Sequence, residues 1–392
     1  MGKIRAKTET ENPRRSSREM VFSCIHRQGR IARVEIARQT GISLMSVGRI
    51  ADDLIRLGIV TEQESGDEST GVGRHPKLLS VDSNRFLSVG VAIDRDGISG
   101  GILNFEGQVL KRAGIARNLT GESPEQVLRQ VAEVIRRLRG EGRDMPLIQT
   151  VGVVCPGLID PAQGIVHFSS QFQWHDVPAV RLLEELTGET DIVLDNEVKA
   201  RAIAEDLFGQ GKNFSRSVVL HIGSGIGSSV MIDHRLYRGR QNMAGEIGHV
   251  CINPTGNMCE CGRRGCLQTY IADWAILKEA GAVQQGITLE EVFEAYQAGK
   301  SWAVNLIDRA VDYVSITISM LANTYAPDEV ILCGSMIEKY ELFRRLVVQN
   351  YKKELNDYVL HSFELRVSGF ANDGTIISAA TMAYYRMLMH LI

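Results

Sequence analysis

The sequence predicts an α/β protein with two units, an N-terminal winged helix-turn-helix and a larger C-terminal domain made of two lobes. Short helical patterns around a glycine turn fill the first part of the chain, and two strand-rich halves, each opening on a glycine-bent hairpin, follow. The charge changes as well. Residues 1–80 carry 14 Lys/Arg and 10 Asp/Glu, out of 44 and 47 in the whole chain. A basic N-terminal part followed by an acidic remainder is a weak indication of nucleic-acid binding.

The overall composition is that of an ordinary globular protein of 392 residues, with 44% hydrophobic and 23% charged residues. No stretch approaches the run of about 20 apolar residues that a membrane span needs. The N-terminus is basic and polar without an apolar core, so it does not resemble a secretory signal. We therefore expect a cytoplasmic protein with no membrane partner, whose residues 1–16 form a basic flexible tail.

Residues 17–82 are predicted to form the winged helix-turn-helix. A first helix begins near Ser16, with Met20, Val21, Cys24 and Ile25 on its buried face. The segment "RVEIARQTGIS" reads as a short helix that ends at Gly41.

The third helix follows a Ser43 cap and ends at Gly58. Its predicted buried face consists of Val47, Ile50, Leu54 and Leu57. Behind it, "IVTEQES" and "PKLLSVDS" predict a β-hairpin wing. The two helices, the glycine turn and the amphipathic third helix together indicate a helix-turn-helix.

The predicted partner of this unit is double-stranded operator DNA. The expected contacts are Ser43, Leu44, Met45, Ser46 and Arg49 on the third helix, and Arg74, His75 and Lys77 on the wing. The alternative is a helical dimerisation module whose arginines are only solvated.

Residues 83–392 are predicted to form the two-lobed domain. Strands are expected over "FLSVGVAID", "GISGGILNF", "VLKRAGIA", "LIQTVGVVCPG" and "DIVLDN". Helices are expected over "SPEQVLRQVAEVIRRLRG", with Val127, Val131, Val134, Ile135 and Leu138 on one face, and over "EVKARAIAEDLFG". The segment "SVVLHIGSGIGSSVMID" then repeats the opening hairpin. This duplication predicts a ligand site in the cleft between two lobes.

The turn "GSGIG" at residues 223–227 is a weak signal by itself. It has neither the lysine of a P-loop nor the strand-to-helix context of a dinucleotide fold. Its backbone could approach a phosphate, or it could be only a tight hairpin.

The seven cysteines fall into two groups. Four of them, Cys24, Cys155, Cys251 and Cys333, stand apart in apolar surroundings and are predicted to be buried small hydrophobes. The other three lie in "GEIGHVCINPTGNMCECGRRGCLQTY", where Cys259, Cys261 and Cys266 have the spacing C-x-C-x₄-C.

His249, ten residues upstream of Cys259, can complete a Cys₃His tetrahedron. Such a set is typical of a structural Zn²⁺, because four protein ligands leave no position for a catalytic water. We therefore predict a zinc knot at residues 249–266, the alternative being reduced cysteines without metal.

The motifs "GEIGH" and "CECGRRGC", together with "VCPGLID" and "GSGIG", resemble the consensus of the ROK family of repressors and sugar kinases. The segment "TGVGRHPKLLSVD" is similar to the one that joins the DNA-binding and sugar domains of ROK repressors. The resemblance covers residues 17 to about 390. It implies an actin-like (ribonuclease-H-like), hexokinase-like pair of lobes, and in members with this N-terminal extension a sugar-responsive transcription regulator.

The kinase site implied by the resemblance is degenerate here. Where the family's kinases have an Asp-x-Gly-Gly-Thr loop, this chain has Ala92 for the Asp, and Asp94, Arg95 and Asp96 for Gly-Gly-Thr. Carboxylates in that loop would repel ATP. The family's catalytic Asp is Glu197, one methylene longer, and a Gly-Gly-Gly motif survives only as Cys-Gly-Ser at 333–335. The resemblance therefore predicts that the chain is not an enzyme.

The sugar pocket is better preserved. By resemblance, Asn196, Glu246 and His249 would bind sugar hydroxyls, with Glu197 and Gln268 as altered members of the same ring. His249 would serve twice, with one ring nitrogen on zinc and the other toward the sugar.

These observations favour a homodimeric or tetrameric repressor of sugar uptake or catabolism genes, with a sugar or sugar-phosphate effector. One alternative is an active ATP-dependent sugar kinase with a regulatory DNA-binding arm. Another is a docking platform for a protein partner, without a small ligand.

Overall fold

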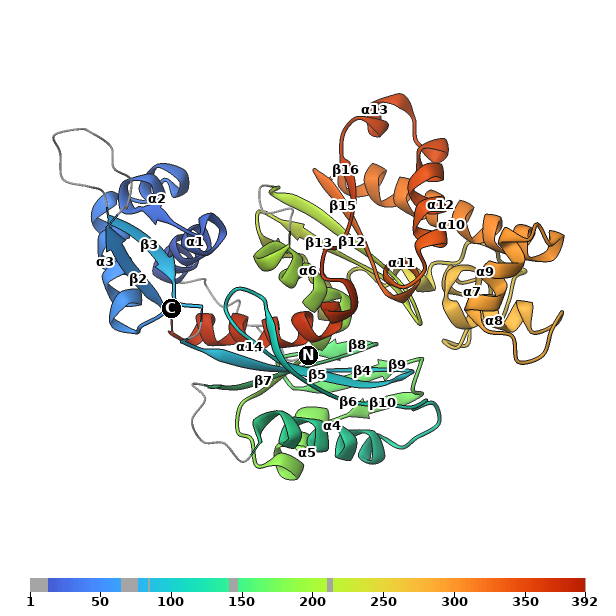
Figure 1. Cartoon of the computed structure of the whole chain (residues 1–392), viewed down its shortest axis with the longest axis horizontal. Coiled ribbons are helices and arrows are strands. Elements are labelled where there is room, and N and C mark those ends of the chain that lie inside the picture. Colours follow the sequence, from blue (N-terminus) through green and yellow to red (C-terminus); the bar gives the residue numbers. More distant parts are fainter. Residues whose placement is uncertain (1–12, 65–76, 84, 141–146, 210–213, 392) are drawn as a thin grey trace, which may run out of the picture.

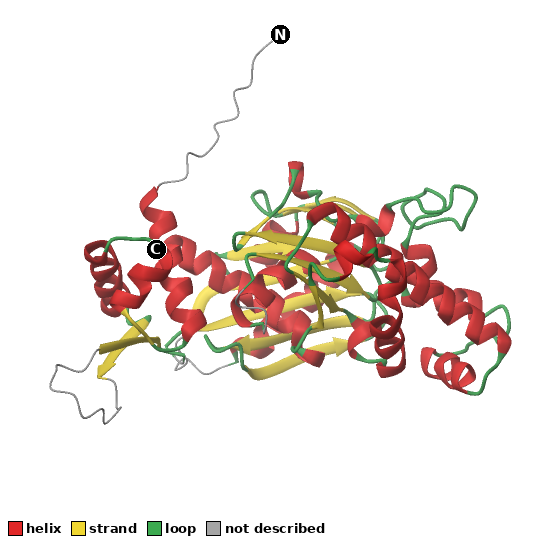
Figure 2. Ribbon diagram, turned by 90° about the horizontal axis from the view of Figure 1, so that it is seen from above, coloured by secondary structure: helices red, strands yellow, loops and turns green. Residues whose placement is uncertain are grey.

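The computed structural model describes residues 13–64, 77–83, 85–140, 147–209 and 214–391. In this part of the chain, a small N-terminal domain lies beside two α/β lobes (Figure 1). The view turned by 90° shows the strands near the middle of the molecule and the N-terminal domain at one end (Figure 2). No helix of the described residues is long and apolar enough to cross a membrane.

Within residues 13–64 and 77–83, the N-terminal domain has three helices and a small antiparallel sheet, as predicted. Helix α2 (Arg33–Thr40) ends at Gly41, whose φ of 70° is left-handed. Ser43 caps α3 (Leu44–Arg56) by accepting a hydrogen bond from the backbone of Ser46 at 3.2 Å. The other elements are α1 (Pro13–Gln28), β1 (Ile31–Ala32), β2 (Val60–Glu64) and β3 (Lys77–Val81), in the sheet order β1-β3-β2.

Three details of this domain differ from the prediction. Helix α1 begins at Pro13, inside the segment predicted to be a tail, because proline is well tolerated in a first helical turn. Met20 is exposed, and Phe22 lies in the core instead. Leu57 is also exposed, because it follows the last turn of α3, whereas Ala51 is buried.

The first lobe is a five-stranded sheet in the order β11-β7-β4-β5-β6, with β11, β7 and β4 parallel. The predicted apolar face of α4 is buried against this sheet. A hairpin sheet, β10-β9-β8, extends the lobe. The elements are β4 (Leu87–Asp94), β5 (Gly97–Leu103), β6 (Val109–Ala116), α4 (Pro124–Arg139), β7 (Leu147–Cys155), β8 (Leu158–Asp160), β9 (Ile165–Ser169), β10 (Trp174–Val177), α5 (Ala179–Thr187) and β11 (Ile192–Asn196).

The second lobe repeats this plan with the sheet order β14-β13-β12-β15-β16, so the predicted duplication of a hairpin followed by parallel strands is confirmed. Its sheet packs against a helical layer that includes the 25-residue helix α10. The main elements are α6 (Glu197–Phe208), β12 (Arg216–Ile222), β13 (Ile226–Ile232), β14 (Arg235–Leu236), α7 (Gln268–Ile271), α8 (Asp273–Ala280), α9 (Leu289–Gln297), α10 (Ser301–Tyr325), β15 (Glu329–Cys333), α11 (Ser335–Glu338), α12 (Glu341–Asn350), α13 (Asp357–Leu360) and β16 (Glu364–Val367).

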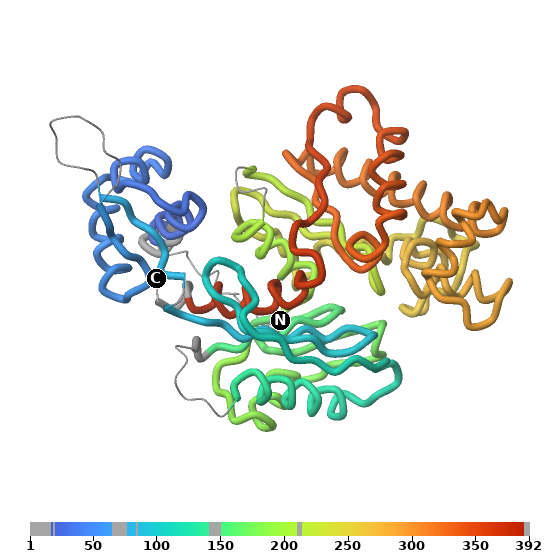
Figure 3. Tube along the Cα trace, viewed as in Figure 1, coloured from blue at the N-terminus to red at the C-terminus, as the bar shows by residue number. Residues whose placement is uncertain are grey.

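The C-terminal helix α14 (Gly374–Leu391) runs between the lobes and ends beside the N-terminal domain (Figure 3). It packs on β4, β7, α6 and α1. Two glycines of the first sheet permit this close approach. A Cβ at Gly90 would lie 2.1 Å from the backbone nitrogen of Ala380, and one at Gly152 would lie 1.9 Å from the carbonyl oxygen of Ala379.

Candidate functional site

The cysteine-rich stretch brings four potential metal ligands together. The ligand atoms of His249, Cys259, Cys261 and Cys266 all lie within 4.8 Å of one another. The sulfurs of Cys261 and Cys266 are 3.7 Å apart, and Nδ1 of His249 is 3.8 Å from the Cys259 sulfur. Ligands about 2.3 Å from a tetrahedral ion lie about 3.7 Å from each other. The residues therefore fit a four-coordinate metal ion.

Glycine turns form this cluster. Gly262 and Gly265 have φ values of 83° and 70°. The Cys259 amide donates to the carbonyl oxygen of Arg263 at 2.7 Å, which closes the turn. A Cβ at Gly265 would lie 1.6 Å from the Asn253 carbonyl oxygen, so a larger residue would displace the backbone.

The prediction for the four other cysteines is wrong at one position. Cys24, Cys155 and Cys333 are buried, but Cys251 is exposed. Its backbone forms an isolated β-bridge with that of Cys266, which places it at the rim of the cluster rather than in a core.

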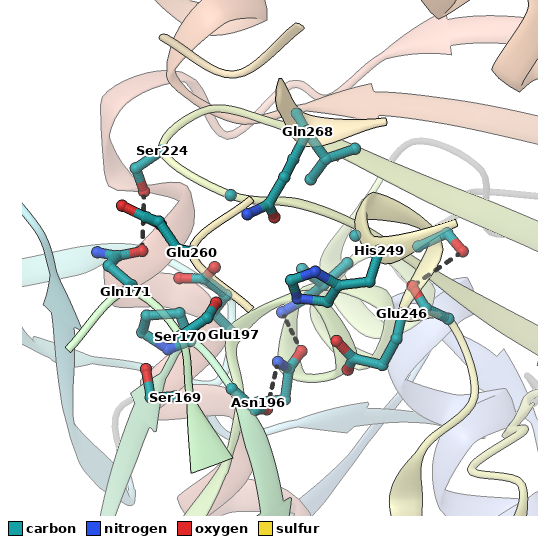
Figure 4. Close-up of a pocket in the computed structure, with 18 residues that line it drawn as sticks. Ser169, Ser170, Gln171, Asn196, Glu197, Ser224, Glu246, His249, Glu260 and Gln268 are labelled. Carbon is teal, nitrogen blue, oxygen red and sulfur yellow. Dashed lines mark hydrogen bonds between the residues drawn. The ribbon is translucent and has the colours of Figure 1, made fainter. Parts of the chain in front are cut away.

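A pocket lies between the two lobes, and Figure 4 shows the side chains that line it. One of them is His249, which also belongs to the potential metal site. All five residues predicted to bind a ligand line the pocket, so the fold brings together side chains from the end of β11, the start of α6 and the cysteine-rich stretch. The polar side chains that line the pocket are Ser169, Ser170, Gln171, Asn196, Glu197, Ser224, Ser228, Glu246, His249, Glu260 and Gln268.

Two carboxyl groups of the pocket have raised pKa values, because burial disfavours their charged form. Desolvation, with the charges of Asp94 and Glu246, raises the pKa of Glu197 well above its ordinary value. Desolvation also raises the pKa of Glu246, against the opposing effect of Lys199. Nζ of the buried Lys199 lies 3.8 Å from a Glu246 oxygen, which holds the carboxylate at the pocket wall.

The amide side chains of Asn196 and Gln268 form hydrogen bonds with other groups of the protein. Oδ1 of Asn196 accepts from the backbone of Val198 and Lys199 at 2.9 and 3.2 Å, and Nδ2 donates to the Gly157 carbonyl oxygen at 3.0 Å. Nε2 of Gln268 donates to the Cys259 sulfur at 3.3 Å. Asn196 thus caps α6 as well as lining the pocket, and Gln268 couples the pocket to the sulfur cluster.

Contacts across the cleft involve residues that the sequence did not single out as ligands. Ser224 Oγ donates to Oδ1 of Asp94 at 2.7 Å, and Arg95 Nη2 lies 2.9 and 3.1 Å from the two carboxylate oxygens of Glu260. Each pair joins the first lobe to the second. The only sequence signal for Glu260 was its position between two metal-ligand candidates, Cys259 and Cys261.

The predicted DNA contacts on α3 are accessible. Leu44, Met45, Ser46 and Arg49 are exposed, with Met45 at 78%. Ser43 is also exposed, and its hydroxyl oxygen caps the helix. Lys77 lies on β3 with its Nζ 3.5 Å from Glu62. The predicted wing contacts Arg74 and His75 lie outside the described residues.

The chain is similar to repressors and kinases of one family. It is 25% identical to the xylose repressor of Bacillus spizizenii, over 95% of this chain and 96% of that protein. It is 31% identical to the glucokinase of Thermotoga maritima, over 76% of this chain and 98% of that protein. The crystal structure of a ROK family transcriptional regulator, a homologue of the Escherichia coli MLC protein, superposes with a TM-score of 0.75 at 22% identity, covering 96% of this chain and 98% of that one.

The two-lobed domain is the part that repressors and kinases share. The Thermotoga glucokinase matches about three quarters of this chain, whereas the xylose repressor matches nearly all of it. The model of the ROK family matches residues 88–385, which is more than half of the chain and contains the pocket and the cysteine cluster. The chain therefore belongs to the ROK family.

Proposed function

We propose that this chain is a sugar-responsive, DNA-binding transcriptional regulator that represses genes of sugar uptake and catabolism. The similarity to xylose repressors over almost the whole length supports this function. So does helix α3, whose residues Leu44, Met45, Ser46 and Arg49 are exposed, because the corresponding helix of helix-turn-helix proteins enters the major groove.

The observation that carries the proposal is the course of helix α6. It begins with Glu197 at the pocket and ends with Phe208 beside the DNA-binding domain. Its 12 residues span about 18 Å, at about 1.5 Å per residue. One rigid element therefore connects the proposed effector site to the domain that would bind DNA.

The far end of α6 contacts α1 directly. Arg27 and Asp206 are paired at 2.7 Å, and the rings of His26 and Phe208 meet edge to face at 5.2 Å. Nε2 of His26 lies 2.9 Å from the Phe105 carbonyl oxygen. Beyond these contacts, the buried core of the N-terminal domain continues into the C-terminal unit through Leu103, Phe105, Ala204, Ile377, Ala380, Tyr384 and Met387.

A sugar can change DNA affinity only by binding one arrangement of the molecule better than another. A movement of α6 against the first lobe would shift α1, and with it the spacing of two DNA-binding domains in a homodimer or tetramer. The usual coupling energy between two such sites is about 1–3 kcal/mol.

The metal that we propose for the cysteine cluster is structural Zn²⁺. Its three sulfurs and one imidazole leave no open position, and soft sulfur ligands favour zinc. The zinc would fix His249 and Gln268 at the pocket wall, with Nδ1 of His249 on the metal side and Nε2 toward the sugar.

A sugar kinase is the second candidate, because the similarity to the Thermotoga glucokinase covers both lobes. Against it, Asp94, Arg95 and Asp96 occupy the loop where the kinases carry Gly-Gly-Thr, and Asp94 and Arg95 bond the opposite lobe. Glu197 would be the base, but it is one methylene longer than the family's Asp, which moves the carboxylate relative to a bound sugar. We therefore propose that kinase activity is absent.

The test is the affinity of the zinc-loaded protein for the DNA upstream of its own gene, at fixed salt, with a panel of sugars. We expect at least one compound to change the dissociation constant by about 5- to 150-fold, without ADP formation from ATP. Sugar-dependent ADP formation would establish the kinase instead. DNA binding that is indifferent to every sugar, but sensitive to a protein partner, would establish a docking platform.

A further inference from the structure

Two cysteines of the cysteine-rich stretch lie directly opposite each other on neighbouring backbone segments. Cys251 and Cys266 form an isolated antiparallel β-bridge. Two backbone hydrogen bonds flank this bridge, from the amide of Ile252 to the carbonyl oxygen of Gly265 at 2.8 Å and from the amide of Leu267 to that of Val250 at 2.9 Å. Cys251 and Cys266 are therefore a non-hydrogen-bonded pair, the kind in which the side chains come closest.

This register allows a disulfide between Cys251 and Cys266 without movement of the backbone. The Cα atoms of a non-hydrogen-bonded pair lie about 4.5 Å apart, and disulfides join Cα atoms that are about 4.4–6.8 Å apart. Directly opposite residues of an antiparallel pair also point to the same face. Rotation of the two side chains about their Cα–Cβ bonds is then enough to bring the sulfurs together.

The two thiols differ in their access to solvent. All seven cysteines lie in the described residues, and Cys251 is the exposed one among them, whereas Cys266 is only 1% exposed. Cys251 is also outside the set of four metal ligands, so a bound ion would hold the Cys266 sulfur and leave the Cys251 sulfur uncoordinated. Because oxidation of cysteine follows exposure, a small oxidant would react first at Cys251.

We infer that Cys251 is an oxidation site, and that its disulfide with Cys266 is a peroxide-sensitive switch that removes one of the four metal ligands. The inference adds a redox input to the proposed regulator. Its metal-release step rests on the zinc proposed above, whereas the disulfide itself rests only on the placement of the two cysteines.

The oxidation proceeds in two steps. Hydrogen peroxide transfers one oxygen atom to the Cys251 thiol, which becomes a sulfenic acid, and the peroxide is reduced to water. The Cys266 thiolate then attacks the Cys251 sulfur, the S–S bond forms as the S–O bond breaks, and the oxygen leaves as water with one proton from solvent. The two sulfurs lose two electrons, which the peroxide gains. A thiol reductant reverses the change by thiol–disulfide exchange.

The disulfide would affect the pocket through the metal-ligand set. It leaves His249, Cys259 and Cys261 as ligands, whereas a closed tetrahedral zinc site has four. Gln268, two residues after Cys266, donates to the Cys259 sulfur at 3.3 Å, and both Gln268 and His249 line the pocket. Oxidation would therefore disturb two pocket residues, while the core of the N-terminal domain contains none of the ligands.

The experiment treats the full-length zinc-loaded protein with hydrogen peroxide, without sugar or DNA. A chromophoric chelator measures the released zinc, and peptide mass spectrometry locates the disulfide. Trypsin cuts after Arg263 and Arg264, so Cys251 and Cys266 fall on different peptides. We expect the release of about one zinc ion per chain together with a cross-linked pair of these peptides. A thiol reductant with added zinc should restore the metal content.

The variant Cys251→Ser identifies the reacting sulfur, because Cys259 and Cys261 share the tryptic peptide of Cys251. We expect the variant to hold zinc before treatment and to release less than about a tenth of the amount that the parent releases. Met258→Leu is the matched control. Met258 is 51% exposed in the same stretch and is also oxidisable, but it has no thiol, so this variant should release zinc as the parent does.

The outcomes separate this inference from the proposed function. Equal zinc release from the parent and Cys251→Ser would overturn the inference, and so would a parent that keeps its zinc under peroxide or a Met258→Leu variant that is protected. A protein purified without zinc would contradict the metal assignment and the release step, and the cross-linked peptides would then decide the disulfide alone. None of these measurements involves sugar or DNA, so a failure here leaves the proposed function standing.

Discussion

Arg27 and Asp206 form an ion pair of 2.7 Å that joins the last turn of α1 to the last turn of α6. The two side chains are only 14% and 11% exposed, and Asp206 also accepts from Nδ1 of His234 at 2.7 Å. Because α6 starts at the pocket, this pair ties the N-terminal domain to an element that reaches the pocket.

Replacing Asp206 with Asn should uncouple sugar binding from DNA binding. We expect the sugar to bind with unchanged affinity, while its effect on DNA affinity falls from about 5- to 150-fold to less than about 3-fold. Removing one charge of a mostly buried pair also lowers the free energy of unfolding, here by about 3–5 kcal/mol. DNA titrations with and without sugar, and urea unfolding, measure the two effects.

Arg38→Ala is the control for that substitution. Arg38 pairs with Glu35 in the N-terminal domain, but its side chain is 76% exposed. The free energy of unfolding should therefore fall by no more than about 0.5 kcal/mol. If Asp206→Asn leaves the full sugar response intact, α6 does not carry the signal to α1.

Replacing Cys261 with Ala should remove the metal. We expect zinc content to fall from about one ion per chain to near zero by mass spectrometry, and the sugar affinity to fall by about 10- to 100-fold, because Gln268 and His249 lose their anchor. The N-terminal domain should stay folded, since its core contains none of the four ligands. Cys251→Ala is the matched control, because Cys251 is exposed and outside the ligand set. Equal zinc content in both variants would contradict the assignment.

The sequence predicted local features well because their causes are local. The apolar face of α4 is buried as its periodicity predicts, and β6 occupies the predicted residues 109–116. Gly41 and Ser43 mark the helix boundaries because left-handed backbone and side-chain capping are properties of single residues.

The contacts across the cleft could not be predicted in the same way. Asp94 and Ser224 are 130 positions apart in the chain, and Arg95 and Glu260 are 165 apart. Their meeting depends on how the lobes close, which no periodicity encodes. For the same reason the sequence predicts only that Asp94 would repel ATP, and not that it accepts a hydrogen bond from Ser224 across the cleft.

Truncating Met45 should weaken DNA binding without changing stability. The side chain is 78% exposed on α3, so Met45→Ala should leave the free energy of unfolding within about 0.5 kcal/mol. Operator affinity should fall by about 5- to 100-fold if the methionine contacts base edges. Leu110→Ala, an exposed apolar position of the first lobe, should change neither quantity. Fluorescence anisotropy at fixed salt measures the affinity, and equal affinity of both variants would remove Met45 from the interface.

The raised pKa of Glu197 makes a pH-dependent contribution to stability. Its folded-state pKa lies above the ordinary value of 4.5, so between the two values the folded protein binds more protons than the unfolded chain. The contribution of Glu197 to stability is therefore greatest below about pH 4.5 and declines as the pH rises through the folded-state pKa.

Glu197→Gln removes this dependence, because the amide does not ionise. We expect the free energy of unfolding of the variant to rise by at least about 1 kcal/mol relative to that of the parent between pH 5 and pH 8. One pKa unit corresponds to about 1.4 kcal/mol. Urea unfolding of both proteins across this range measures the difference, with Glu106→Gln as the exposed control. If the difference between the two free energies of unfolding stays constant with pH, Glu197 has the same pKa in the folded and unfolded states. It would then carry a full charge in the pocket at neutral pH.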